Sequence, residues 1–306
     1  MNSFTSEPVG RPVVGMDFDE IGEIAAPIPS EYRDAFAQLA TQGKLPGQDV
    51  ELRFVPIHDL QRRRVTTFFC SPVFCVEDAS LIYGYRAFQG IGSRELPFID
   101  RAILAHAVKF ARKLANAGTV AAIGTSVNYA TLASPRGREV YQKALCAAGV
   151  SDCPFLMLKV EDVPAGTSAA ELAETVNLLR PYVKRIFVHV PDTETALHSA
   201  NYLGASGLVL SLPPRPSRMM IMGAAKWLLN ECTVQEAHSC IDVIDDDETL
   251  ELIRAAGIRF GAGPVFGSRE FRGDAHPSAV EYYMAEIARS SARDGAPPAH
   301  DETRGA

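Results

Sequence analysis

The distribution of apolar residues predicts that the folded part of the chain begins with a β-hairpin. Apolar and polar residues alternate from residue 50 to residue 57, and a second strand-like run covers residues 64–76. The connection between them, residues 60–64, is short. Two strand patterns joined by so short a connection are typical of a hairpin.

After the hairpin, short apolar segments alternate with amphipathic ones. We predict strands at residues 120–127, 155–160, 185–190, 207–212, 239–244 and 258–261, and helices at residues 97–116, 134–148, 168–179, 193–203, 217–230, 246–256 and 278–290. Two of these helices carry end signals: Thr167 or Ser168 as N-cap with Glu171 placed for a capping box, and a terminating Gly257.

These strands lack polar residues at alternate positions, which is typical of parallel strands buried on both faces. Repeated β–α units indicate either a barrel or a doubly wound sheet. No glycine-rich phosphate loop follows the early strands, so the dinucleotide-binding fingerprint is missing. Of the two α/β architectures, we predict the TIM-like (β/α)8 barrel.

The two ends of the chain differ from its middle. Residues 1–48 are rich in Pro, Gly and acidic groups, and only residues 31–41 have a helical pattern. We expect residues 1–48 to be a partly disordered N-terminal arm, residues 49–292 to be the barrel, and residues 293–306 to be a disordered tail.

Composition limits the classes of partner. The 306 residues carry a net charge of −7, which argues against nucleic acid and anionic membranes as partners. No apolar stretch approaches the roughly 20 residues of a membrane span, and the first residues lack the pattern of a signal peptide. We therefore expect a cytoplasmic protein.

Cysteines and clustered basic residues offer little chemistry. No two of the six cysteines have the spacing of a zinc knuckle or a redox motif, and most lie in apolar stretches, which predicts buried free thiols. The basic run Arg62–Arg64 falls on the hairpin connection. It is either a solvated tip or an anion site.

In a β/α barrel, functional residues follow the carboxyl ends of the strands. Asn128 ends one predicted strand and is either a polar ligand or a cap of the next turn. His189 is either a general base or metal ligand, or a satisfied core residue. The acidic run of Asp242 and residues 245–247 is either a metal site or the N-cap and first turn of a helix.

Several motifs, in this order, resemble the EAL family of cyclic-di-GMP phosphodiesterases. The segment 54–60 followed by Arg64-Val65 is similar to that family's first strand and hairpin, and residues 99–104 are similar to its first helix. Residues 126–128 (Ser-Val-Asn) are similar to its third-strand motif, and residues 250–267 to its ending. The resemblance spans residues 49–292. It implies a barrel whose first strand runs antiparallel to the rest.

The resemblance also implies which residues should be catalytic, and most are replaced. The family's enzymes use two Mg²⁺ or Mn²⁺ ions held by clustered carboxylates. The Glu-Ala-Leu signature falls on Phe69-Cys70-Ser71, the fourth-strand metal-binding Glu on Lys159, the base-contacting Gln on Val55, and the fifth-strand Asp pair near His189 and Val190.

Most of the family's residues in the later motifs are also replaced. The sixth-strand Lys falls at about Ser211, the Glu-Gly-Val-Glu motif on residues 242–245 (Asp-Val-Ile-Asp), and the Gln of the ending on Ala262, while Asn128 is retained. The resemblance thus implies no catalytic residue, no bound metal and no cofactor. The vestigial pocket would consist of Asn128, Lys159, His189, Asp242 and Asp245.

Three functions stay open. The leading hypothesis is a catalytically inactive EAL-like domain that acts as a regulatory or protein-interaction module in bacterial signalling. The second is a receptor that binds cyclic-di-GMP without hydrolysis, and the third is an active phosphodiesterase. A protein partner is expected, and a homodimer is an open alternative. The cluster Met219–Met222 is either an exposed adaptable contact or the buried face of a helix.

Overall fold

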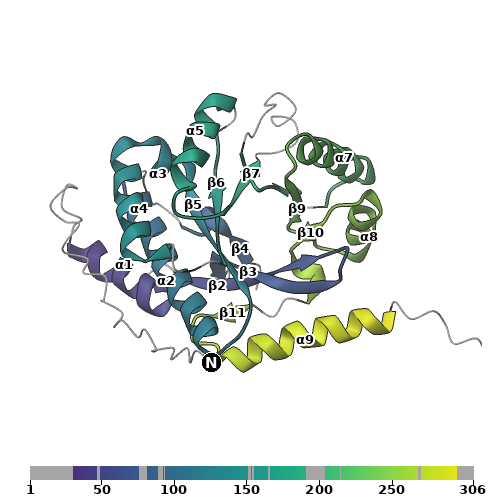
Figure 1. The fold of residues 1–306 in the computed structure, drawn as a ribbon, viewed down its shortest axis with the longest axis horizontal. Helices are drawn as coiled ribbons and strands as arrows, with labels where there is room; N and C mark the ends of the chain where they lie inside the picture. The colour runs from purple at the N-terminus through teal and green to yellow at the C-terminus, as the bar shows by residue number, and fades with distance from the viewer. Residues whose placement is uncertain are drawn as a thin grey trace, which may run out of the picture.

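The computed structural model describes residues 30–46, 49–75, 81–88, 92, 94–150, 153, 155–164, 166–190, 204–213, 215–267 and 270–294. Its centre is a closed barrel of eight strands (Figure 1). In the order in which they pair around the barrel, these are β2 (Val50–Asp59), β10 (Phe260–Gly261), β9 (His238–Asp242), β8 (Gly207–Ser211), β7 (Arg185–Val190), β6 (Leu156–Glu161), β5 (Ala122–Asn128) and β3 (Arg64–Cys75).

Strand β2 closes the barrel and runs opposite to its neighbours. It pairs antiparallel with both β3 and β10, whereas all the other barrel pairings are parallel. The predicted hairpin and the α/β barrel with an antiparallel first strand are therefore confirmed. Three short strands extend the sheet: β1 (Lys44–Leu45) and β11 (Phe271–Arg272) pair with β2, and β4 (Leu81–Tyr83) pairs with β3.

Helices surround the barrel (Figure 1). They are α1 (Ser30–Gln42), α2 (Leu96–Asn116), α3 (Tyr129–Ala133), α4 (Pro135–Ala147), α5 (Ala169–Leu179), α7 (Arg218–Val234), α8 (Asp247–Ala256) and α9 (Pro277–Asp294), with the 3-10 turns η1 (Gly84–Ala87) and η3 (Pro264–Phe266). The predicted capping box at Ser168 and Glu171 is present, and Gly257 ends α8 in the left-handed conformation. The helix predicted at residues 193–203 lies outside the described residues.

Several predicted boundaries shift by a few residues, and two of the shifts are the following. Strand β9 ends at Asp242, two residues before the predicted end, because Val243 has a left-handed φ of 58° that breaks the extended conformation. Helix α7 continues to Val234, four residues beyond the prediction. The short helix α3, which the sequence did not predict, precedes Ser134, whose hydroxyl accepts a hydrogen bond from the Gly137 amide and starts α4.

The barrel separates two hydrophobic cores. The larger core lies between the strands and the helices. The smaller core fills the barrel interior with Phe69, Met157, Phe187, Val209 and Cys240. Successive residues of a strand point to opposite faces, so each strand serves both cores at once. This explains why the strands show no polar alternation in the sequence.

Residues 30–46, assigned to the arm from their composition, pack onto the barrel. Phe36 and Leu39 of α1 are buried in the larger core, and β1 pairs with β2. Helix α1 lies beside α2 (Figure 1), and the ring of Phe36 stacks on Phe98 at a centroid distance of 6.3 Å. This part of the chain contributes to the folded core.

Candidate functional site

A layer of polar side chains lies directly above the interior core, at the carboxyl ends of the parallel strands. Because side chains on one face of a strand recur every two residues, the residues two positions after the core members face the same interior, and so does Ser126, two positions after Gly124, which faces the Phe69 ring. They are Ser71, Ser126, Lys159, His189, Ser211 and Asp242. We call this set the polar layer. It occupies the end of the barrel where β/α barrels carry their functional residues.

An ion pair on β6 dominates the polar layer. Lys159 Nζ lies 2.8 Å from Glu161 Oε1, and the Ser126 hydroxyl donates to the same carboxylate at 2.5 Å. Both charged side chains are largely buried, with 12% and 9% of their side-chain surfaces exposed. The Lys159 ammonium also lies 5.3 Å from the centre of the Phe69 ring, which is a favourable cation–π distance.

The surroundings keep this pair ionised. Burial lowers the pKa of Lys159, but the carboxylates of Glu161 and Asp242 outweigh it, so the pKa rises above its usual value. Burial raises the pKa of Glu161, but Lys159, His189 and two hydrogen bonds outweigh it, so that pKa falls. The ammonium of Lys159 is thus a fixed positive charge between two carboxylates.

On the other side of the layer, three side chains from neighbouring strands form a hydrogen-bonded chain. His189 Nε2 lies 2.7 Å from Ser211 Oγ, and the Ser211 hydroxyl donates to Asp242 Oδ1 at 2.5 Å. Because the Ser211 hydroxyl donates its hydrogen bond to the carboxylate, the imidazole Nε2–H donates to the serine oxygen. The Ser211 hydroxyl therefore donates to Asp242 and accepts from His189. In this arrangement His189 cannot act as a base toward the hydroxyl.

The structure brings together some of the predicted site residues. Lys159, His189 and Asp242 share the polar layer. Asn128 caps helix α3, since its Oδ1 accepts a hydrogen bond from the Ala130 amide at 2.9 Å, and its Nδ2 donates to Asp162 at 2.8 Å. The cap interpretation of Asn128 is confirmed.

Asp245 stands apart from the other four. It is exposed in the connection between β9 and α8, and no contact joins it to the polar layer among the residues that the structure describes. Its neighbour Asp246 caps α8 by accepting a hydrogen bond from the Thr249 amide at 2.8 Å, and Asp247 lies in the first turn. The helix-start interpretation of the acidic run is confirmed for residues 246–247.

The sequence analysis did not predict two buried acidic residues of this region, Glu161 and Asp100. Glu161 could have been found, because it follows Lys159 by two residues on a strand and must face the same side. Asp100 of α2 gave no such signal. It is fully buried, accepts hydrogen bonds from the Tyr85 hydroxyl and from the Asn128 amide, at 3.2 Å for the nearer oxygen, and burial raises its pKa to about 7. Asp100 therefore supports the end of β5 from outside the barrel.

Solved structures with the same arrangement identify the fold. The chain is 12% identical to an EAL-domain protein from Listeria monocytogenes EGD-e, with a TM-score of 0.56 over 83% of this chain and 96% of that one. The fold is that of an EAL domain. No protein-family model and no curated protein sequence matches the chain.

Two further EAL structures agree with this fold. The EAL domain of Xanthomonas citri FimX, solved in complex with c-di-GMP, is 14% identical, with a TM-score of 0.51 over 84% of this chain and 97% of that one. The Bacillus subtilis YkuI protein, solved with c-di-GMP and calcium, is 13% identical, with a TM-score of 0.55 over 80% of this chain and 63% of that one. At these identities the likeness establishes the EAL-like barrel alone.

The barrel places the positions of the EAL motifs in the interior. Phe69, where the signature Glu is expected from the resemblance, lies in the interior core and meets Phe187 edge-on at a centroid distance of 6.2 Å. An ideal Cβ on Gly124 of the next strand would lie only 2.4 Å from the Phe69 ring. The aromatic ring thus fills space that a glycine leaves open on β5.

None of the described helices combines the length and apolar character that a bilayer-spanning helix requires. The methionines of α7 decide between the two alternatives that the sequence left open for this cluster. Met219, Met220 and Met222 have 84%, 43% and 41% of their surfaces exposed, and only Ile221 turns into the core. The alternative of an exposed contact therefore describes this helix better than a buried face.

Proposed function

We propose that this chain is a catalytically inactive EAL-like domain that acts as a regulatory, protein-binding module in cytoplasmic bacterial signalling. The observation that carries the proposal is the ion pair between Lys159 and Glu161 inside the polar layer. By the resemblance, Lys159 stands where the family has its fourth-strand metal-binding Glu, so in this proposal an ammonium group replaces a metal ligand.

The donor set does not suit two divalent ions. Such ions need several carboxylate or imidazole ligands that are free to bind them. Glu161 is paired with Lys159, Asp242 accepts a hydrogen bond from Ser211, and the Phe69 ring offers no ligand atom. In the described ranges, no group of three or more His, Cys, Asp and Glu side chains is arranged to hold a metal ion.

Electrostatics adds to this mismatch. A divalent ion placed beside the buried Lys159 ammonium would meet a like charge in a region of low dielectric, where repulsion is strong. The raised pKa of Lys159 means that the ammonium does not lose its proton easily to relieve the repulsion. Of the predicted pocket, the part that the fold brings together, Lys159, His189 and Asp242, is accordingly vestigial in this proposal.

The exposed methionines of α7 support a protein-binding role. Methionine side chains are flexible and polarisable, and they are frequent on surfaces that adapt to a partner. Met219, Met220 and Met222 lie near the start of α7, which follows β8 at the same end of the barrel as the polar layer. We infer that this surface contacts another protein, with a second copy of the chain as one outcome of the test.

A second candidate is a receptor that binds cyclic-di-GMP without cleaving it. What favours it is that the FimX and YkuI structures with the same fold were solved with this nucleotide bound. Against it stand the missing family residues, because recognition of guanine and phosphate requires specific polar partners.

Calorimetry separates these functions. Cyclic-di-GMP is titrated into the protein with Mg²⁺ and then with Ca²⁺, and the mixtures are assayed for linear product beside an active EAL phosphodiesterase. We expect neither heat nor product. Saturable heat without product would establish the receptor, and turnover would refute the inactive domain.

The protein-binding role needs its own experiment. The triple variant Met219→Ser, Met220→Ser and Met222→Ser should keep its urea midpoint, because these side chains are exposed. It should lose the complex that the wild type forms with its partner or with itself, measured by light scattering after size exclusion. The control is Val234→Ser, which alters a 70% exposed residue at the other end of α7. A complex that survives the triple variant would rule out this surface.

A further inference from the structure

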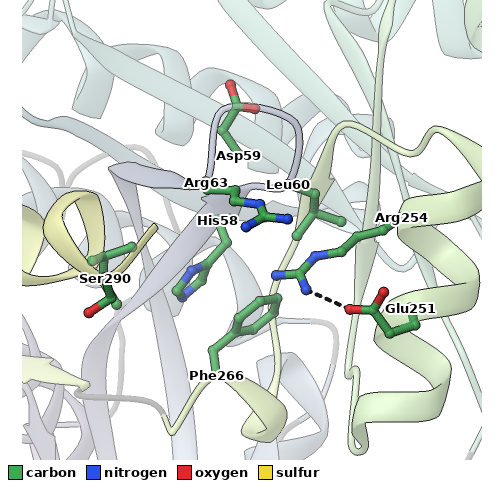
Figure 2. Close-up of a pocket in the computed structure, with 9 residues that line it drawn as sticks. His58, Asp59, Leu60, Arg63, Glu251, Arg254, Phe266 and Ser290 are labelled. Carbon is green, nitrogen blue, oxygen red and sulfur yellow. Dashed lines mark hydrogen bonds and ion pairs between the residues drawn. The ribbon is translucent and has the colours of Figure 1, made fainter. Parts of the chain in front are cut away.

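A cavity of about 400 Å³ lies at the end of the barrel opposite to the polar layer. Five segments line it: the end of β2, the β2–β3 hairpin tip, helix α8, the turn η3 and helix α9 (Figure 2). Their lining residues are His58, Asp59, Leu60, Arg63, Glu251, Arg254, Phe266, Ile287 and Ser290. A cavity of this size is within the usual range of small-molecule sites.

Two arginines converge on this cavity from distant parts of the chain. Figure 2 shows the guanidinium groups of Arg63 and Arg254 on the same side as the rings of His58 and Phe266, whereas the Asp59 carboxylate points away from them. Asp59 accepts a hydrogen bond from the Arg62 amide at 2.9 Å and lies 3.8 Å from Arg259, so its charge is engaged elsewhere.

Arg254 is incompletely satisfied. Its Nη1 donates to Glu251 at 2.8 Å, but Glu251 has 71% of its side chain exposed, and such surface pairs contribute little. Its Nε is buried and finds no hydrogen-bond acceptor within the described ranges. A buried donor left without an acceptor is costly, and an anion would supply the acceptor if it drew the Arg254 side chain into the cavity.

Apart from the carboxylates of Asp59 and Glu251 and the hydroxyl of Ser290, the rest of the cavity lining is apolar and aromatic. The His58 ring stacks on Phe266 at a centroid distance of 3.8 Å and an interplanar angle of 10°, and Leu60 and Ile287 complete the wall. Burial, together with the charge of Arg254, lowers the pKa of His58 to about 4, so His58 is a neutral ring at physiological pH. The cavity therefore combines two guanidinium groups with a flat apolar surface.

We propose that this cavity binds a small organic anion, namely a phosphate group attached to a planar apolar group. The guanidinium groups of Arg63 and Arg254 would hold the phosphate oxygens, since a planar guanidinium matches an oxyanion with two parallel hydrogen bonds. Phe266 and Leu60 would contact the apolar group. The site is one of binding and not of chemistry, because β/α barrels do not carry catalytic residues at the amino-terminal ends of their strands.

This proposal uses none of the residues of the polar layer, so a failure of the proposed function leaves it standing. Heat with cyclic-di-GMP that persists in Arg63→Gln would come from the polar layer and not from this cavity. Phenyl phosphate is the probe, titrated by calorimetry at low ionic strength, with inorganic phosphate and phenol as comparison ligands. We expect phenyl phosphate to bind more tightly than either one, and its binding to weaken as salt is added.

Variants locate the site. Arg254→Gln and Arg63→Gln should each weaken phenyl phosphate binding about tenfold, the usual effect of losing one charged hydrogen bond. The matched control is Arg218→Gln, an exposed arginine at the start of α7, which should bind as the wild type does. Arg63 lies at an exposed hairpin tip, so its variant should fold even if Arg254→Gln does not.

Three results would overturn the proposal. One is the absence of heat with phenyl phosphate at millimolar concentration. The second is equal affinity for phenyl phosphate and phenol, and the third is unchanged affinity in the folded Arg63→Gln variant.

Discussion

Lys159 Nζ and Glu161 Oε1 lie 2.8 Å apart inside the barrel, and the two residues are two positions apart on strand β6. The pair needs no contribution from another element, because the strand itself places both side chains on one face. What the barrel adds is burial. The same two residues on an exposed strand would form a weak, water-screened pair.

Removing the cation of this pair should be costly. Lys159→Met leaves the Glu161 carboxylate buried without a counter-charge, and such changes destabilise proteins by about 3–5 kcal/mol. Adding Glu161→Gln should recover most of the loss. The control is Lys143→Met, which removes an exposed pair with Glu139 at 2.9 Å and should cost less than about 1 kcal/mol. Urea unfolding measures all three variants, and similar losses for Lys159→Met and Lys143→Met would contradict the buried pair.

The contact between Phe69 and Gly124 should make that glycine hard to replace. An added Cβ would lie 2.4 Å from the ring, so Gly124→Ala should destabilise the protein by about 1–3 kcal/mol through overpacking. Gly223→Ala on α7 is the control, since its Cβ would meet nothing and alanine favours a helix. Phe69→Leu in the Gly124→Ala background should restore part of the loss, and strictly additive unfolding free energies would argue against the contact.

Asp100 should make the protein less stable as the pH rises. Burial raises its folded-state pKa to about 7 from a usual value of 3.8, so its contribution is fully present below pH 3.8 and is lost as the pH rises through 7. The full effect is about 4 kcal/mol. Asp100→Asn should flatten this part of the profile, measured by urea unfolding between pH 4 and 8. An unchanged slope in the variant would show that Asp100 titrates normally in the fold.

His58 should have the opposite dependence on pH. Its folded-state pKa is lowered to about 4 by burial and by Arg254, so its contribution is present above pH 6.5 and is lost as the pH falls toward 4. The loss approaches roughly 3 kcal/mol. His58→Phe preserves a ring against Phe266 but cannot take up a proton, so its stability should fall less than that of the wild type between pH 6.5 and 4.5. Parallel profiles would refute the lowered pKa.

Local patterns in the sequence were sufficient for the architecture. The periods of strands and helices, the capping box at Ser168 and the terminal Gly257 depend on neighbours within one or two turns, and they are confirmed. The hairpin followed from a short connection in the same way, and the EAL resemblance implied that its first strand runs antiparallel to the rest of the barrel. Such features are local, so tertiary packing adjusts only their ends, as at Val243.

The site was predictable only in part. Lys159, His189 and Asp242 lie near strand ends, and the barrel topology alone predicts that they lie at the same end of the barrel. The exposed position of Asp245 and the capping role of Asn128 depend on how the strands end and where the next helix starts. The spacing of Glu161 from Lys159 is enough to predict that both side chains face the same side of the strand. The burial of Asp100 could not be predicted, because it depends on the packing of α2 against β5.

The sequence by itself determined the order of strands and helices, because this order follows from residue types and short spacings. Only the tertiary structure decided that Ser211 joins His189 to Asp242, that Met219 faces outward, and that Arg254 meets Arg63 beside Phe266. These contacts link segments far apart in the chain. The register of each strand against its neighbours in the closed barrel determines which of these distant residues come into contact. No pattern of neighbouring residues in the sequence specifies that register.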